Sequence, residues 1–222
     1  MKLKECENFW GLGLFLGAVG LLSALVLAVV SDVTGPAVAA AEKRTKSAAL
    51  KQLFSDFDND PARERRECDG VVFMAVRKGG HLVGIAAEAE TANGYAGKIR
   101  ELVGFTPDGR ILAVLITEEK ETPGLGKNVC ERKFKKTIVN FLKPAPKGLP
   151  ENEILDQFSG RKAGDRIDWR VKKDGGEFKY RTGATVTSRA VTEMTGKTAK
   201  TFAAHRAAIL ANFAKQAPEV TK

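Results

Sequence analysis

The residues with the clearest chemical potential lie near the end of the chain, where residues 182–187 read Thr-Gly-Ala-Thr-Val-Thr. Small residues ahead of a helical pattern from about Ser188 predict a turn at a helix N-terminus, where backbone N–H groups lack partners. Such a turn can bind phosphate, and the hydroxyls of Thr185 and Thr187 are placed to be joined covalently to it. The alternative is an ordinary cap, with Thr187 or Ser188 accepting hydrogen bonds from first-turn amides.

A second loop of unusual composition covers residues 121–126, Glu-Thr-Pro-Gly-Leu-Gly. Proline fixes one backbone angle, and glycine lets the main chain approach a flat ligand closely. Leu125 would cover an apolar ring face, while Thr122 and backbone amides would bond to ring heteroatoms. A plain Pro-Gly chain reversal is the alternative.

Both loops need a framework, and the hydrophobic patterns predict strands with helices around them. Strands are expected at residues 71–76, 81–89, 98–106, 110–117 and 167–172, with a hairpin turn at the Pro-Asp-Gly of 107–109. Helices are expected at residues 37–54, 128–142 and 189–213. This order predicts an α+β fold with a mainly antiparallel sheet flanked by helices.

The N-terminal part is apolar, since residues 9–30 carry no charged side chain. As a helix they would be about 33 Å long, enough to cross the hydrocarbon core of a bilayer. A cleaved signal peptide competes with this interpretation, but the apolar run exceeds the usual signal core of roughly 7–15 residues, which favours a retained anchor. The predicted organisation is a short tail (1–8), a transmembrane anchor (9–30), a linker and helix (31–54) and a folded domain (55–222).

Charge and cysteine usage exclude other classes of protein. Lys and Arg outnumber Asp and Glu by 36 to 27, for a formal net charge of +9, but the basic residues are spread along the chain without an aromatic-rich basic motif. Nucleic-acid binding is therefore not expected. The cysteines lack CxxC spacing and there are only two histidines, so neither a metal site nor a Cys-His catalytic set is expected. Cys68 and Cys130 would form a disulfide in an oxidising compartment or remain buried free thiols.

Taken together, the motifs resemble the FMN-binding domain of the RnfG and NqrC subunits of ion-translocating membrane oxidoreductases, with RnfG the closer match. The segments that carry the resemblance run in order along nearly the whole chain: 94–100, 108–112, 120–126, 171–176, 182–187 and 189–191. The resemblance implies an FMN-binding domain of α+β class behind one N-terminal transmembrane helix.

The resemblance also implies a covalent cofactor. In this family the last threonine of [Ser/Thr]-Gly-Ala-Thr-x-Thr carries FMN through a phosphoester bond, which a separate flavin transferase makes from FAD. Here that residue is Thr187, and Lys179 stands where the family usually has an aspartate. The implied cofactor contacts are Glu121, Thr122, Gly124 and Leu125 at the flavin ring, Gly183, Ala184 and Thr185 in the phosphate turn, and Lys172, which either balances the phosphate or lies in a solvated turn.

The function implied is that of an electron relay, not a stand-alone catalyst, in an Rnf-type complex that couples electron flow between ferredoxin and NAD to ion translocation. Its expected partners are other membrane and iron–sulfur subunits. Family topology places the FMN domain on the periplasmic side of the inner membrane, although positive charges after the anchor weakly favour a cytoplasmic domain. A membrane-anchored flavin sensor and an anchored interaction module without flavin are the alternatives.

Overall fold

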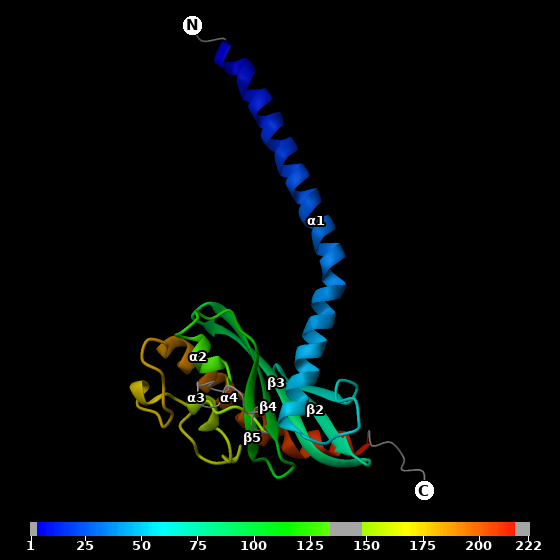
Figure 1. Cartoon of the computed structure of the whole chain (residues 1–222), viewed down its shortest axis with the longest axis vertical. Helices are drawn as coiled ribbons and strands as arrows, with labels where there is room; N and C mark the ends of the chain where they lie inside the picture. Colours follow the sequence, from blue (N-terminus) through cyan, green and yellow to red (C-terminus); the bar gives the residue numbers. More distant parts are fainter. Residues whose placement is uncertain (1–3, 134–147, 216–222) are drawn as a thin grey trace, which may run out of the picture. The chain divides into compact units, whose positions relative to one another are not determined.

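The strands form one five-stranded sheet in the order β1-β2-β3-β4-β5, with every neighbouring pair antiparallel (Figure 1). The computed structural model describes residues 4–133 and 148–215. The strands are β1 (Arg65–Cys68), β2 (Val71–Lys78), β3 (His81–Gly94), β4 (Gly97–Phe105) and β5 (Ile111–Glu118). The predicted α+β class with an antiparallel sheet is confirmed.

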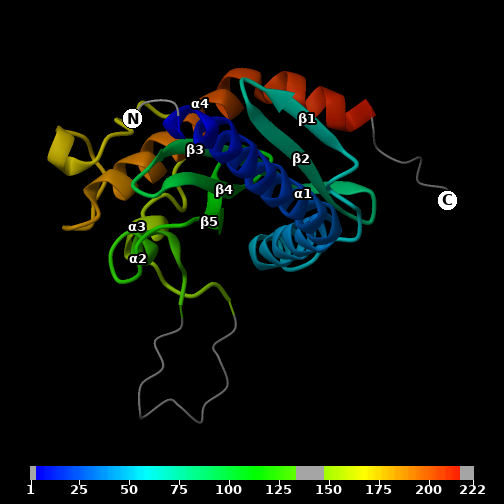
Figure 2. The same ribbon diagram turned by 90° about the horizontal axis from the view of Figure 1, so that it is seen from above.

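Successive side chains of a strand point to opposite faces of the sheet, and here both faces are buried. On one face, Phe73 and Phe105 pack with Phe202 of α4 (Thr185–Lys215), and the rings of Phe105 and Phe202 stack 4.6 Å apart. Figure 2 shows α4, in orange to red, extending along the sheet. On the other face, Met74 packs with Leu50 near the C-terminal end of α1 (Lys4–Leu53).

The hairpin turns follow the sequence signals. The turn predicted at residues 107–109 joins β4 and β5, where Gly109 has a φ of 94°. Strand β1 was not predicted, because Arg65–Cys68 carries charged side chains in place of an apolar alternation.

The strand predicted at residues 167–172 is wrong. Val171 makes only an isolated bridge to Phe178, and Lys172–Asp174 forms the short 3-10 helix η1. Trp169 is buried by stacking on Phe178, with ring centroids 5.1 Å apart. The apolar residues of this segment therefore fill a local aromatic cluster and make no strand ladder.

The helix predicted at residues 128–142 is also wrong in its described part. Helix α2 comprises only Lys127–Cys130, and Glu131 is already extended, with φ −94° and ψ 131°. The side chain of Arg132 donates hydrogen bonds to the carbonyls of Val114 and Pro150, which fixes this residue outside the helix. Residues 134–142 lie outside the described part of the chain. The short helix α3 spans Glu153–Asp156.

The N-terminal helix α1 spans Lys4–Leu53, so the predicted anchor and the predicted helix of residues 37–54 belong to one helix, which ends one residue before the predicted end. Its apolar window has a mean hydropathy of 2.5 and no buried side chains, and by length and composition it can cross a membrane. The chain divides into two units, Met1–Lys46 and Ser47–Lys222, and the last turns of α1 belong to the second. One long apolar N-terminal helix fits a single-pass membrane anchor.

Candidate functional site

Thr187 and Glu121 form a buried polar pair that joins the two loops singled out by the sequence. Thr187 lies in the first turn of α4 with 1% of its surface exposed, and its hydroxyl donates a hydrogen bond to Glu121 Oε2 over 2.8 Å. Glu121 is 4% exposed, and its Oε1 accepts a hydrogen bond from the backbone N–H of Ala96 over 3.2 Å. Glu121 therefore connects α4, its own loop and the turn between β3 and β4.

Two glycines make room for this carboxylate. A Cβ atom on Gly126 would lie 2.3 Å from Glu121 Oε2 and 2.7 Å from Thr187 Oγ1, and one on Gly94 would lie 2.7 Å from Glu121 Oε1. Gly126 has an ordinary helical φ of −60°. This position therefore needs glycine for space and not for conformational freedom. We call the space between Gly94 and Gly126 that holds the Glu121 carboxylate the glycine slot.

The rest of the 121–126 loop forms a tight turn that leads into α2. The carbonyl of Thr122 accepts hydrogen bonds from the N–H groups of Leu125 and Lys127, and that of Gly124, whose φ is 82°, accepts one from Asn128 Nδ2. Leu125 is 46% exposed. The structure thus presents Thr122, Gly124 and Leu125 at the surface, while Glu121 lies beneath it.

The threonine segment begins α4 earlier than predicted. The helix starts at Thr185 instead of residue 189, after Gly183 with a φ of 81°. Ala184 is buried, and its carbonyl accepts hydrogen bonds from both the N–H and the hydroxyl of Ser188. Within the described chain, the N–H groups of Thr185, Val186 and Thr187 meet no acceptor. Amides without a protein acceptor, which a phosphate-binding turn needs, are therefore present in the motif itself.

The helix-cap alternative for Thr187 is wrong. An N-cap side chain accepts hydrogen bonds from first-turn amides. The Thr187 hydroxyl instead donates to Glu121. Ser188 accepts from the N–H of Arg181, which lies before the helix.

In the described chain, no hydrogen bond or ion pair joins Lys172 or Lys179 of the sequence analysis to this pair. Lys172 is exposed in η1, and within the described residues its side chain makes no hydrogen bond or ion pair. The η1 turn is nevertheless tied to α4, because Arg189 makes two hydrogen bonds to Asp174, of 2.6 and 2.9 Å, which lower the pKa of that carboxyl. Lys179 forms an ion pair of 3.1 Å with Glu153 of α3.

Exposed apolar side chains accompany the polar pair. Tyr95 is 73% exposed in the β3–β4 turn, Leu125 is 46% exposed in its loop, and Val186 is 42% exposed in the first turn of α4. Each belongs to one of the three segments that Glu121 connects. Exposed apolar surface beside a few fixed polar groups suits a flat ring. The sequence analysis did not single out Tyr95 or Val186, whose signal is an apolar side chain next to a glycine turn or a helix start.

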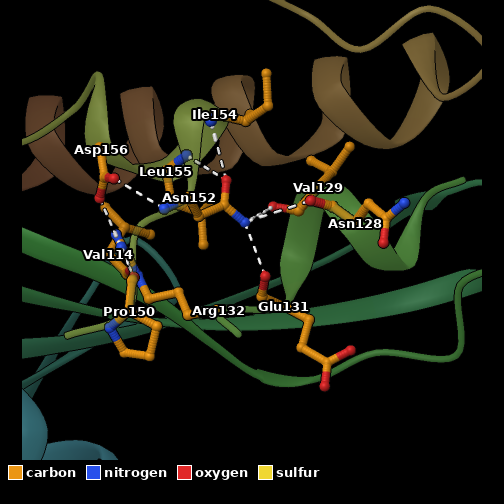
Figure 3. A network of polar contacts seen from close by, with 10 residues as sticks. All are labelled: Val114, Asn128, Val129, Glu131, Arg132, Pro150, Asn152, Ile154, Leu155 and Asp156. Carbon is orange, nitrogen blue, oxygen red and sulfur yellow. Dashed lines mark hydrogen bonds and ion pairs between the residues drawn. The ribbon is translucent and has the colours of Figure 1, made fainter. Parts of the chain in front are cut away.

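A network around Asn152 anchors α2, and with it the loop (Figure 3). The Asn152 side chain caps α3 by accepting from the N–H groups of Ile154 and Leu155. Its Nδ2 lies within hydrogen-bond distance of three carbonyls, those of Asn128, Val129 and Glu131. Sequence reasoning missed Asn152, although an Asn before an apolar run is a recognisable cap signal. The carbonyls that its Nδ2 contacts could not be predicted, because they belong to a segment more than twenty positions earlier.

Cys68 and Cys130 are free thiols. Cys68 lies on β1 and Cys130 on α2, and the structure has no bridge between them. Burial raises the pKa of Cys130 to about 12, with the charges of Glu119 and Glu121 adding to the effect. Cys130 is therefore a protonated, buried thiol in this structure.

Comparison with known proteins places this site in a family. Residues 94–200 match the family described as the FMN-binding domain, a range that starts at Gly94 of the glycine slot and includes Thr187. A protein of Cereibacter sphaeroides, named as the G subunit of an ion-translocating oxidoreductase complex, is 33% identical over 208 residues, which cover 90% of this chain and 86% of the relative. Proteins of the same name from Pseudomonas aeruginosa and Photorhabdus laumondii are 31% and 34% identical, over 89% and 84% of this chain and 90% and 87% of the relatives.

The chain belongs to the family of G subunits of ion-translocating oxidoreductase complexes. This membership confirms the predicted resemblance and the predicted FMN-binding domain. The residues present fit the group: the free amides at the start of α4 suit a phosphate, and Tyr95, Leu125 and Val186 suit an aromatic ring. FMN, when bound, supplies the redox chemistry, while the protein supplies its position and its electrostatic surroundings.

Proposed function

We propose that this chain is the electron-transfer subunit of an Rnf-type complex and carries FMN covalently on Thr187. Family membership and the FMN-binding domain support an electron-transfer role in an ion-translocating oxidoreductase. The observation that carries the site is the setting of Thr187: its hydroxyl is held by a buried carboxylate beside unpaired helix N-terminal amides. Electron flow between ferredoxin and NAD, coupled to ion translocation, is the complex-level activity implied by the resemblance.

Different segments of the domain bind the phosphate and the ring of the cofactor. The segment Gly183, Ala184 and Thr185 forms the phosphate turn, where the N–H groups and the positive end of the α4 dipole stabilise the remaining negative charge of a phosphodiester. Thr122, Gly124 and Leu125 line the ring. Lys172, in the η1 turn that the Arg189–Asp174 contact ties to α4, contributes a positive charge that balances the phosphate.

The membrane arrangement follows the same family resemblance. Helix α1 anchors the chain in the inner membrane, and the FMN domain lies on the periplasmic side, where a covalent bond prevents loss of the cofactor. The partners are other membrane and iron–sulfur subunits, together with the flavin transferase that loads the domain. Accessibility of Cys68 in the β1 strand to a membrane-impermeant thiol reagent, measured in intact spheroplasts after mild denaturation, tests the sidedness.

In-gel flavin fluorescence tests the covalent site. The full-length chain, coexpressed with a flavin transferase, should give a fluorescent band after denaturation, and peptide mass spectrometry should locate the flavin on Thr187 and not on Thr185. Thr187→Val should abolish the band, while Thr187→Ser, which keeps a hydroxyl, should retain it. A dark wild-type band in the presence of the transferase would overturn the covalent assignment.

Copurification then tests the role of the protein in the complex. A loaded chain that purifies with membrane and iron–sulfur subunits acts as a relay. A loaded chain that purifies alone under the same mild conditions contradicts the relay and supports the sensor alternative.

A further inference from the structure

We propose that Glu121 is the general base for flavin attachment, the group that takes the proton from Thr187 as the phosphoester bond forms. This inference rests on the proposed covalent site. A general base must lie within about 2.6–3.2 Å of the group whose proton it removes. Glu121 Oε2 lies 2.8 Å from Thr187 Oγ1, and the hydroxyl hydrogen already points to the carboxylate.

Glu121 is the only group in direct polar contact with the Thr187 hydroxyl among the described residues. No ion pair joins Glu121 to a cation in that part of the chain, and the neighbouring Lys127 pairs instead with Glu119. The carboxylate thus accepts hydrogen bonds from a backbone N–H and a hydroxyl, and within the described chain it forms no ion pair with a lysine or arginine.

The glycine slot aims the carboxylate at Thr187. Oε1 is occupied by the N–H of Ala96, which leaves Oε2 for the hydroxyl. Side chains at Gly94 or Gly126 would occupy the space of these oxygens. Because both oxygens are committed in a buried slot, we assign Glu121 to the attachment chemistry in place of the ring contact expected from the loop motif.

The attachment step balances as follows. Thr187 Oγ1 forms a bond to the phosphorus of the FMN half of FAD, the bond from that phosphorus to the bridging pyrophosphate oxygen breaks, and AMP leaves. The hydroxyl proton passes to Glu121 Oε2, and nothing is oxidised or reduced. A protonated Glu121 also avoids placing a carboxylate against the new phosphodiester, since two adjacent anions destabilise each other.

The test is a time course of attachment with the full-length chain in detergent, purified flavin transferase and FAD, followed by in-gel fluorescence. Glu121→Gln keeps the size and shape of the side chain but cannot accept the proton. We expect its initial rate to fall by about 100-fold or more, the range typical of a lost general base. Its thermal unfolding transition should match that of the wild type, which separates lost chemistry from lost structure.

Chemical rescue provides a readout that a purely structural role would not change. Glu121→Ala empties the slot, and added formate should restore its attachment rate in proportion to concentration, whereas chloride at equal ionic strength should not. Wild-type speed in Glu121→Gln, or an unrescued Glu121→Ala that still shows a folded transition, overturns the proposal; if Glu121→Ala does not fold, the Glu121→Gln rate alone decides. Absence of covalent flavin on the wild type is a different result, since it overturns the proposed function itself.

Discussion

Gly126 and Thr187 lie so close that a single methyl group on Gly126 would come within 2.7 Å of the Thr187 hydroxyl oxygen. The same methyl would approach Glu121 Oε2 to 2.3 Å, a distance that non-bonded atoms do not tolerate. The polar pair at the centre of the site therefore depends on a glycine in a different segment of the chain from Thr187.

Gly126→Ala should destabilise the domain and slow flavin attachment. The carboxylate cannot move aside easily, because Gly94 and the surrounding chain enclose it, so an overpacking cost of about 1–3 kcal/mol is expected. Urea unfolding of the full-length chain in detergent measures the free energy, and in-gel fluorescence measures attachment.

Gly164→Ala is the matched control for this substitution. A Cβ atom on Gly164 meets no heavy atom within 4 Å. We expect its free energy of unfolding to stay within about 0.5 kcal/mol of the wild type. Equal effects of the two substitutions would show that the glycine slot is not the cause.

Glu101 makes the stability of the domain depend on pH. Its side chain is fully buried between β4 and α4, where it accepts hydrogen bonds from Thr195 and Thr198, and burial raises its pKa from 4.5 to about 7. The folded state therefore holds this proton more tightly than the unfolded state. The contribution of Glu101 to stability is full below about pH 4.5 and is lost as the pH rises to about 7.

Glu101→Gln should remove this dependence. At pH 8 the variant should be more stable than the wild type. The difference in the free energy of unfolding, variant minus wild type, should be larger at pH 8 than at pH 4.5 by on the order of 3 kcal/mol. Urea unfolding of both proteins at the two pH values measures the change. An identical pH dependence in the two proteins would contradict a buried proton at Glu101.

Gly196→Ala should destabilise the protein, against the usual trend for helices. In an open helix position, Ala is more stable than Gly by about 0.5–1 kcal/mol. Here a Cβ atom would lie 2.5 Å from Cβ and Cγ of Trp169, so we expect a net loss of about 1–3 kcal/mol. Fluorescence of Trp169 in a Trp10→Phe background reports the displaced indole, and a stabilised variant would disprove the clash.

Asn152→Ala should weaken the attachment of α2 to α3. The substitution removes the α3 cap and leaves the carbonyls at the end of α2 without their amide donor, for an expected cost of about 2–3 kcal/mol. Asn128→Ala, which removes one exposed hydrogen bond to Gly124, is the control and should cost less than about 1 kcal/mol. Thermal unfolding compares the two, and equal losses would argue against the network in Figure 3.

Local patterns in the sequence predicted much of the framework. The Pro-Asp-Gly turn at residues 107–109 and the apolar alternation on either side are short-range signals, and the β4–β5 hairpin follows from them. The same patterns misled at residues 167–172, where Trp169 and Val171 are buried by an aromatic cluster and not by a strand neighbour. They also failed beyond Cys130, where the helix ends. There Arg132 donates to the carbonyl of Pro150, and the carbonyl of Glu131 accepts from Asn152, and both partners are distant in the sequence.

The sequence by itself determined the apolar anchor, the antiparallel α+β plan and the two loops, and by family resemblance it predicts Thr187 as the flavin residue. Only the tertiary structure decided that the Thr187 hydroxyl faces Glu121 and that Gly94 and Gly126 make the space for that contact. The reason is physical: turns and periodic burial depend on residues a few positions apart, whereas this contact joins residues 66 positions apart. It forms only when the start of α4 meets the 121–126 loop and the β3–β4 turn.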